Sequence, residues 1–155
     1  MVYFLFHIER ANIPIDRAFV SELFGSLMFP AQQVIIDSTG EIEPSAQNPF
    51  VFKTFDEARA HPELAKLKWV FFHARAKEYL QEYDHPEDNV IYCVGSDWMG
   101  FGHGPGELDG DWLRVAAPDP GRDDGIQEFH AATLLPLIVY DRALKSWQKR
   151  SLTKS

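Results

Sequence analysis

Short apolar runs alternate with polar stretches along most of the chain. Five runs of apolar, β-branched and aromatic residues have the length of buried strands: residues 3–8, 33–37, 68–73, 89–94 and 112–116. Apolar residues recur at three- and four-residue spacing over residues 19–27, and a second helical pattern begins at about residue 129. Because strands alternate with helical stretches, the pattern predicts an α/β fold with a mostly parallel sheet, built as a single domain over residues 1–155.

The polar stretches between these runs predict where helices begin and where loops lie. Thr54 and Glu57 have the spacing of a capping box, so we expect a helix through about Ala60. Glycine and proline mark residues 38–48, 102–110 and 118–125 as loops. Ligands of parallel sheets bind at the carboxyl ends of the strands. The loops expected there are residues 9–16, 74–76, 95–101 and 116–127.

Composition narrows the class of protein. The chain is 45% hydrophobic and 25% charged, the balance of a soluble globular domain. No apolar run approaches the ~20 residues of a membrane helix, and the N-terminus lacks the basic lead of a signal peptide, so we expect no membrane segment and no export. A single cysteine, Cys93, excludes an internal disulfide and a cysteine-cluster zinc site, which favours a cytoplasmic location.

The charge is unevenly distributed. The formal net charge of −8 counts against tight autonomous binding to nucleic acid, which usually requires a basic surface. Residues 97–128 hold eight acidic and two basic side chains, whereas residues 142–155 hold five basic and no acidic ones. The basic tail is interpreted first as the end of a helix complementing its own dipole, and second as a phosphate-binding patch.

Candidate chemistry from motifs is sparse. The glycine turn at residues 95–100 would let a ligand approach the backbone, but it lacks the spacing of a dinucleotide-binding loop or a P-loop and is equally typical of a tight turn. His103 lies near three acidic residues, Glu107, Asp109 and Asp111, without any known metal-ligand spacing, so a solvated loop is favoured and no metal is expected. Cys93 lies within an apolar strand and is interpreted as a small buried residue rather than a nucleophile.

Three segments of the C-terminal half, taken in order, carry a family resemblance, and a fourth segment near the N-terminus adds to it. Residues 94–101 (VGSDWMGF) are similar to a Gly-x-Glu-x-x-Gly-Leu loop, and residues 113–117 (LRVAA) to an Ile-Arg-Ile-Pro-Met strand end. Residues 129–140 (FHAATLLPLIVY) are similar to a Leu-Asn-x-Ser-x-Ala segment before a last helix, and residues 12–17 (NIPIDR) to an asparagine-to-arginine motif after a first strand. In this order the chain resembles the SPOUT methyltransferases, and most closely their SpoU/TrmH-like branch.

The resemblance implies a C-terminal trefoil knot in the α/β fold, a rare exception to unknotted topology. It also implies a homodimer that binds S-adenosylmethionine and methylates RNA, a tRNA or an rRNA, usually on a ribose 2′-oxygen. The residues that it assigns to the cofactor are Phe72, Gly95, Ser96, Asp97, Gly100, Val115, Ala117 and Phe129. The residues that it assigns to catalysis are Asn12, Arg17 and His130, with Arg17 beside the target hydroxyl.

This sequence departs from the family pattern at several of these positions. His130 stands where the family has asparagine, Ala132 where it has serine, and Asp97 where it has glutamate. His130 is therefore either a base or donor, or a histidine satisfied at the start of a helix. Arg17 is either catalytic or a solvated charge on a helix. Two functional alternatives follow: a catalytically inactive SPOUT-like or flavodoxin-like binding module, and methylation of a nucleobase or a protein.

Overall fold

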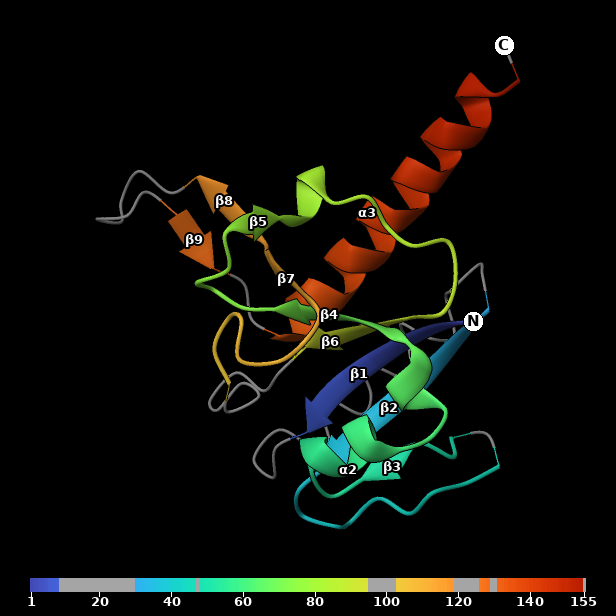
Figure 1. The fold of residues 1–155 in the computed structure, drawn as a ribbon, viewed down its shortest axis with the longest axis vertical. Coiled ribbons are helices and arrows are strands. Elements are labelled where there is room, and N and C mark those ends of the chain that lie inside the picture. The colour runs from blue at the N-terminus through green and yellow to red at the C-terminus, as the bar shows by residue number, and fades with distance from the viewer. Residues whose placement is uncertain (9–29, 47, 95–102, 119–125, 129–130, 155) are drawn as a thin grey trace.

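Parallel strands form the centre of the protein (Figure 1). The computed structural model describes residues 1–8, 30–46, 48–94, 103–118, 126–128 and 131–154. Their strands form a seven-stranded sheet in the order β3-β2-β1-β6-β4-β7-β5, in which every pairing is parallel. The strands are β1 (Val2–Ile8), β2 (Ala31–Asp37), β3 (Val51–Phe52), β4 (Lys68–Phe72), β5 (Glu78–Tyr79), β6 (Val90–Val94) and β7 (Asp111–Arg114).

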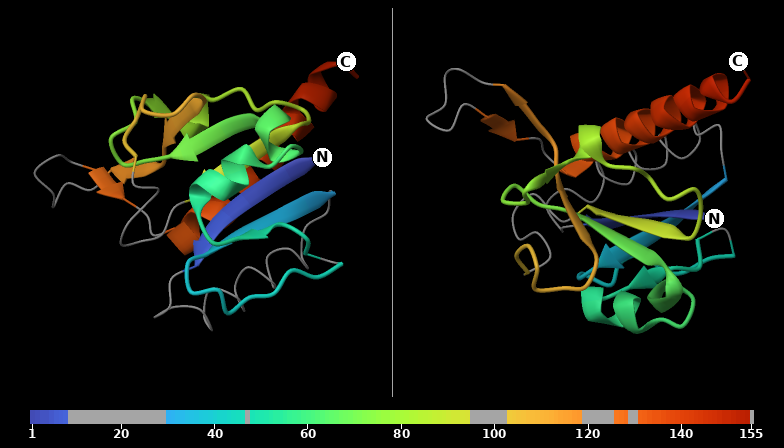
Figure 2. Two further views of the ribbon diagram at one scale, coloured as in Figure 1. Left: turned by 60° about the horizontal axis from the view of Figure 1, so that its bottom comes forward. Right: turned by 45° about the horizontal axis from the view of Figure 1, so that its top comes forward.

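The remaining elements lie on and beside this sheet (Figure 2). A separate hairpin pairs β8 (Ala116–Pro118) with β9 (Ile126–Glu128) in antiparallel register. The helices are α2 (Phe55–Ala60) and α3 (Ala131–Leu152), with short 3₁₀ turns η2 (Leu64–Lys66) and η3 (Leu80–Glu82). No helix in the described ranges is long and apolar enough to cross a membrane.

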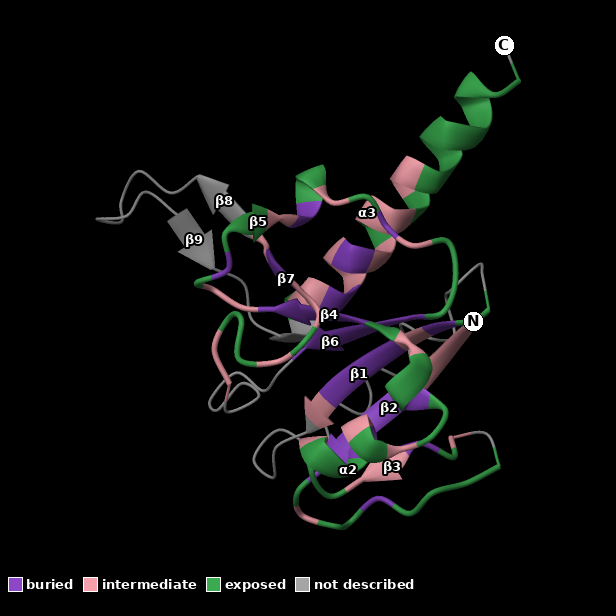
Figure 3. Cartoon of the chain, in the orientation of Figure 1, coloured by how far each residue is buried: buried purple, intermediate pink, exposed green. Residues whose placement is uncertain are grey.

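The sheet is apolar on both faces, which explains why its strands are nearly continuous hydrophobic runs. All five residues of β6 are buried (Figure 3). Along β4 the side chains alternate, so that Val70 and Phe72 belong to one core cluster and Trp69 and Phe71 to the other.

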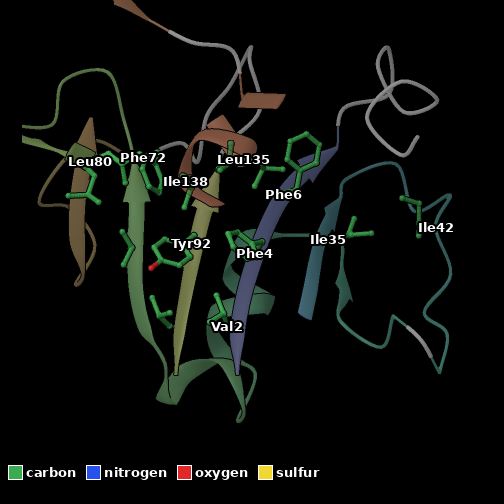
Figure 4. Close-up of a cluster of buried hydrophobic side chains, with 14 residues drawn as sticks. Val2, Phe4, Phe6, Ile35, Ile42, Phe72, Leu80, Tyr92, Leu135 and Ile138 are labelled. Atoms are coloured by element: carbon green, nitrogen blue, oxygen red, sulfur yellow. The ribbon is translucent and has the colours of Figure 1, made fainter. Parts of the chain in front are cut away.

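A different helix covers each of these two clusters. The first cluster contains Leu135 and Ile138 of α3, which pack with Phe4, Phe6 and Tyr92 (Figure 4). The second contains Ala58 of α2 and Leu64 of η2. The sheet therefore lies between α3 on one face and α2 with η2 on the other.

Most sequence predictions within the described ranges are confirmed. The mostly parallel α/β sheet is present, and four predicted strands differ from β1, β2, β4 and β6 by at most two residues at either end. Thr54 and Glu57 form the expected capping box, and α2 ends at Ala60. The helical pattern predicted from about residue 129 is α3, which the described residues place from Ala131.

Two predictions near the C-terminal half need correction. The strand predicted over residues 112–116 is two strands, because β7 ends at Arg114 and β8 begins at Ala116. The sequence predicts one loop over residues 116–127, but residues 116–118 pair with residues 126–128 through backbone hydrogen bonds as β8 and β9. The helix predicted over residues 19–27 lies outside the described residues. The trefoil knot stays a prediction, since residues 95–102 and 119–125 also lie outside them.

Candidate functional site at the carboxyl edge of the sheet

The strand order creates a topological switch point between β1 and β6. These two strands are neighbours, with Phe6 opposite Val94. The next strand after β1 is β2, on one side, whereas the next strand after β6 is β7, beyond β4 on the other side. Where the chain leaves adjacent strands in opposite directions, the loops separate and leave a crevice outside the carboxyl ends. The carboxyl end of β6 is thus the favoured place for a ligand, and the glycine-containing segment that begins at Gly95 follows directly from it in the sequence.

Two of the predicted cofactor residues come together at this same edge. Phe72 ends β4 and lies opposite Leu113 of β7, and the His73 N–H donates to the Leu113 carbonyl at 3.0 Å. Val115 follows β7 and packs, half-buried, against the core cluster that contains Phe72. Figure 4 places Phe72, Phe6 and Leu135 toward the end at which the strand arrows point. Phe72 is only 6% exposed, so it would form the base of a pocket rather than project into it.

The other predicted site residues are only partly placed. Ala117 lies in β8 with Gln127 as its partner in the ladder, so its backbone belongs to the hairpin beyond β7. The remaining positions lie outside the described residues: Asn12, Arg17, Gly95, Ser96, Asp97, Gly100, Phe129 and His130.

A buried carboxylate at the end of β2 has a structural role. The Asp37 side chain is 1% exposed and accepts hydrogen bonds from the backbone N–H groups of Thr39 (3.0 Å) and Ile42 (2.7 Å) and from the Thr39 hydroxyl (2.6 Å). Burial alone would raise the pKa of Asp37, but these hydrogen bonds outweigh it and hold the pKa below its usual value. The carboxylate therefore fixes the turn after β2 and has no proton to offer at neutral pH.

A buried polar cluster, absent from the sequence predictions, joins α3 to the loop before β6. His85 Nδ1 lies 2.7 Å from the Tyr92 hydroxyl, and His85 Nε2 lies 2.7 Å from Asp141 Oδ2. Arg142 Nη1 donates to the Tyr92 hydroxyl at 3.1 Å and to the Pro86 carbonyl, and its Nη2 donates to the Glu87 carbonyl at 2.6 Å. We call Tyr92, His85, Asp141 and Arg142 the α3 anchor.

A neutral His85 satisfies the hydrogen bonds of the α3 anchor. The Asp141 carboxylate accepts only, so in the neutral ring Nε2 carries the proton and Nδ1 accepts from the Tyr92 hydroxyl. Burial raises the pKa of Tyr92 to about 12, so the hydroxyl keeps the proton that it donates. Burial also lowers the pKa of His85, and this effect outweighs the opposing attraction of Asp141. The anchor is therefore complete at neutral pH without a charge on the imidazole.

This arrangement predicts that the protein loses stability as the pH falls. Because the pKa of His85 is lower in the folded than in the unfolded state, the unfolded chain takes up a proton near pH 6.5 that the folded chain does not. Between pH 7.5 and 5.5 we expect this residue to remove up to about 1 kcal/mol from the free energy of unfolding. Urea denaturation at the two pH values measures it. The difference should be smaller in His85→Gln, and an equal difference in both proteins would contradict the assignment.

Two other chemical candidates are less suited to catalysis. Cys93 is fully buried, and burial raises the pKa of its thiol well above its usual value, so it stays protonated as the sequence predicted. His103 Nδ1 lies 3.9 Å from Glu107 Oε2 on the surface. Across the ranges given above, no group of three or more His, Cys, Asp or Glu side chains is placed to hold a metal ion.

The comparisons with known proteins leave the family open: no family model matches the chain, and no curated protein matches it.

Proposed function

We propose that this chain is an S-adenosylmethionine-dependent RNA methyltransferase that uses the carboxyl edge next to β6 as its cofactor site. One observation carries the proposal. Phe72, assigned to the cofactor by the family resemblance, belongs to the apolar core cluster next to the switch point of the sheet, and Val115, assigned in the same way, packs against that cluster. A ligand with an apolar aromatic part suits this wall, because burying such a ring against apolar side chains is favourable without further polar partners.

In the proposed methyl transfer, different residues of the chain bind the cofactor, orient the RNA and accept the proton. Bound S-adenosylmethionine supplies an electrophilic methyl group. Phe72 and Val115 provide an apolar wall for the adenine, and the backbone of the Gly95 turn provides hydrogen-bonding groups without a Cβ in the way. Arg17 orients the RNA beside its target 2′-oxygen and stabilises the charge that develops there, because its guanidinium is always protonated. His130 is the group proposed to take the proton from the 2′-hydroxyl.

The charge distribution also bears on the oligomeric state of the protein and on its RNA substrate. Three of the five basic side chains of the C-terminal segment, Arg142, Lys145 and Lys149, already bond to groups within the chain, so one copy keeps little basic charge for RNA. We therefore propose a cytoplasmic homodimer acting on a tRNA or an rRNA, in which two copies combine the charges that remain. No metal is assigned to the reaction.

The test is transfer of a labelled methyl group from S-adenosylmethionine to total RNA, beside binding of S-adenosylhomocysteine measured by thermal shift. Micromolar affinity at 100- to 1,000-fold ligand excess should stabilise the wild type by about 2–4 kcal/mol. Arg17→Ala should keep this shift and lose methyl transfer, because the arginine acts on the RNA and not on the cofactor. Lys66→Ala, an exposed charge on η2, is the matched control and should keep both.

Results of these two assays that differ from the expected ones would change the proposal in specific ways. No thermal shift contradicts the cofactor site. A shift without any transfer favours the inactive binding module, and transfer to bases or protein instead of ribose corrects the acceptor. Equal transfer by Arg17→Ala and the wild type removes Arg17 from the mechanism.

A further inference from the structure

A pocket of about 270 Å³ lies on the α2 side of the sheet, away from the proposed cofactor site. Its walls include Arg59 of α2, Lys68 and Trp69 of β4, and Asp109 and Gly110 before β7. Lys68 is the first residue of β4 and Phe72 the last, so the two sites lie about 13 Å apart along the strand. Trp69 and Phe72 also face opposite sides of the sheet. The pocket is therefore a separate place for a ligand.

Arg59 is held in this pocket by aromatic rings rather than by an acid. Its Cζ lies 4.9 Å from the centre of the Trp69 ring and 5.7 Å from that of Phe71. The Trp69 indole is itself fixed, because its Nε1–H donates to the Leu64 carbonyl at 3.0 Å. Stacking uses the flat face of the guanidinium and leaves the N–H groups at its edge for other partners.

Among the residues that the structure describes, none accepts a hydrogen bond from Nη1 of Arg59. Arg59 Nη1 is buried and has no hydrogen-bond partner, and Arg59 forms no ion pair within the part of the chain that the structure describes. A buried donor without an acceptor is costly, and the guanidinium edge matches the two oxygens of a phosphate or carboxylate. An oxyanion in the pocket would satisfy it once a small shift of the Arg59 side chain exposes Nη1 to the ligand.

The two other charged residues of the pocket, Lys68 and Asp109, indicate which further groups a ligand must carry. Lys68 Nζ lies 3.0 Å from Asp111 Oδ1, so its charge is already paired. Asp109 is exposed and forms no ion pair among the described residues. The next residue packs closely on β4, since a Cβ at Gly110 would lie 2.6 Å from the Trp69 carbonyl oxygen. The pocket thus offers a cationic edge from Arg59 and a carboxylate from Asp109.

We propose that this pocket binds a small phosphate or carboxylate that also carries a hydroxyl donor, with the oxyanion on Arg59 and the hydroxyl on Asp109. The volume suits a ligand of a few carbons, because the pockets that bind drug-sized ligands have volumes of about 300–1,000 Å³.

The test follows the Trp69 indole N–H resonance by NMR during titrations with inorganic phosphate, glycerol 3-phosphate and glycerate at constant ionic strength. We expect saturable shifts, with glycerol 3-phosphate or glycerate binding more tightly than phosphate, and the tighter of the two identifies the oxyanion. Arg59→Met, which keeps an apolar cover on Trp69, should weaken binding at least tenfold. Asp109→Asn should weaken binding of the hydroxyl-bearing probes several-fold relative to phosphate, because it removes the charged hydroxyl acceptor while easing the repulsion of every anion alike.

Two control variants distinguish binding in this pocket from unspecific attraction of anions to positive charge. Arg75→Met removes an exposed arginine that does not line the pocket and should bind as the wild type does. Arg59→Lys keeps the positive charge but loses the two parallel N–H donors of the guanidinium, so it should bind the probes weakly. Shifts that never saturate, or equal binding by Arg59→Met and the wild type, would overturn the site. An unchanged Asp109→Asn would overturn the hydroxyl contact.

Discussion

Arg142→Met is expected to lower the free energy of unfolding by about 3 kcal/mol. Arg142 donates to the Pro86 and Glu87 carbonyls and to the Tyr92 hydroxyl, and so fastens α3 to the loop before β6. Each lost charge-assisted hydrogen bond costs about 1.5–3 kcal/mol when the acceptor stays buried, although solvent reaches the Glu87 end and reduces its share. Methionine keeps much of the aliphatic stem, so the loss reports the hydrogen bonds rather than packing.

Urea denaturation of the variant beside Arg150→Met measures this loss. Arg150 lies on the same helix, is exposed, and its side chain forms no ion pair or hydrogen bond among the described residues, so its replacement should change the free energy of unfolding by less than about 0.5 kcal/mol. Equal stabilities of the two variants would mean that the hydrogen bonds of Arg142 do not hold α3 in place.

Gly110→Ala should destabilise the protein by about 3 kcal/mol as well. A Cβ at this position would lie 2.6 Å from the Trp69 carbonyl oxygen and 2.7 Å from the Phe71 ring. Neither neighbour can yield easily, because Trp69 is part of the sheet backbone and the Phe71 ring stacks 4.6 Å from Trp112 in the core. The backbone φ of 149° adds strain for any residue with a side chain.

Gly104→Ala is the matched control, since a Cβ there would only touch the flexible Glu107 side chain at 3.8 Å. Thermal and urea unfolding should place this control within about 0.5 kcal/mol of the wild type. A Gly110→Ala protein as stable as the control would show that the loop before β7 is not pressed against β4.

The long strands of the sheet could be predicted from their apolar runs, whereas the two-residue strands and the hairpin could not. The long apolar runs of β1 and β6 are buried on both faces, so hydrophobicity alone identifies them as central strands. The strands β3 and β5 have two residues each, too few for any alternation to appear. The hairpin of β8 and β9 depends on pairing across residues 119–125, which no local pattern reports.

The α3 anchor was missed for a similar reason. His85 and Asp141 are 56 residues apart in the sequence, so no motif spacing joins them. A signal does exist on α3: Asp141, Arg142 and Lys145 follow Ile138 at spacings of three, four and seven residues, and therefore continue its buried face with charges. Charged residues on the buried face of a helix indicate polar partners on the element that it covers.

Amide hydrogen exchange with and without S-adenosylhomocysteine tests the cofactor site most directly. The proposal predicts slower exchange in peptides that cover residues 95–101, 115–117 and 129–130 when the ligand is present, and unchanged exchange over residues 59–69. Unchanged exchange in the first three segments, or slowing confined to residues 59–69, would contradict a cofactor site at the carboxyl end of β6.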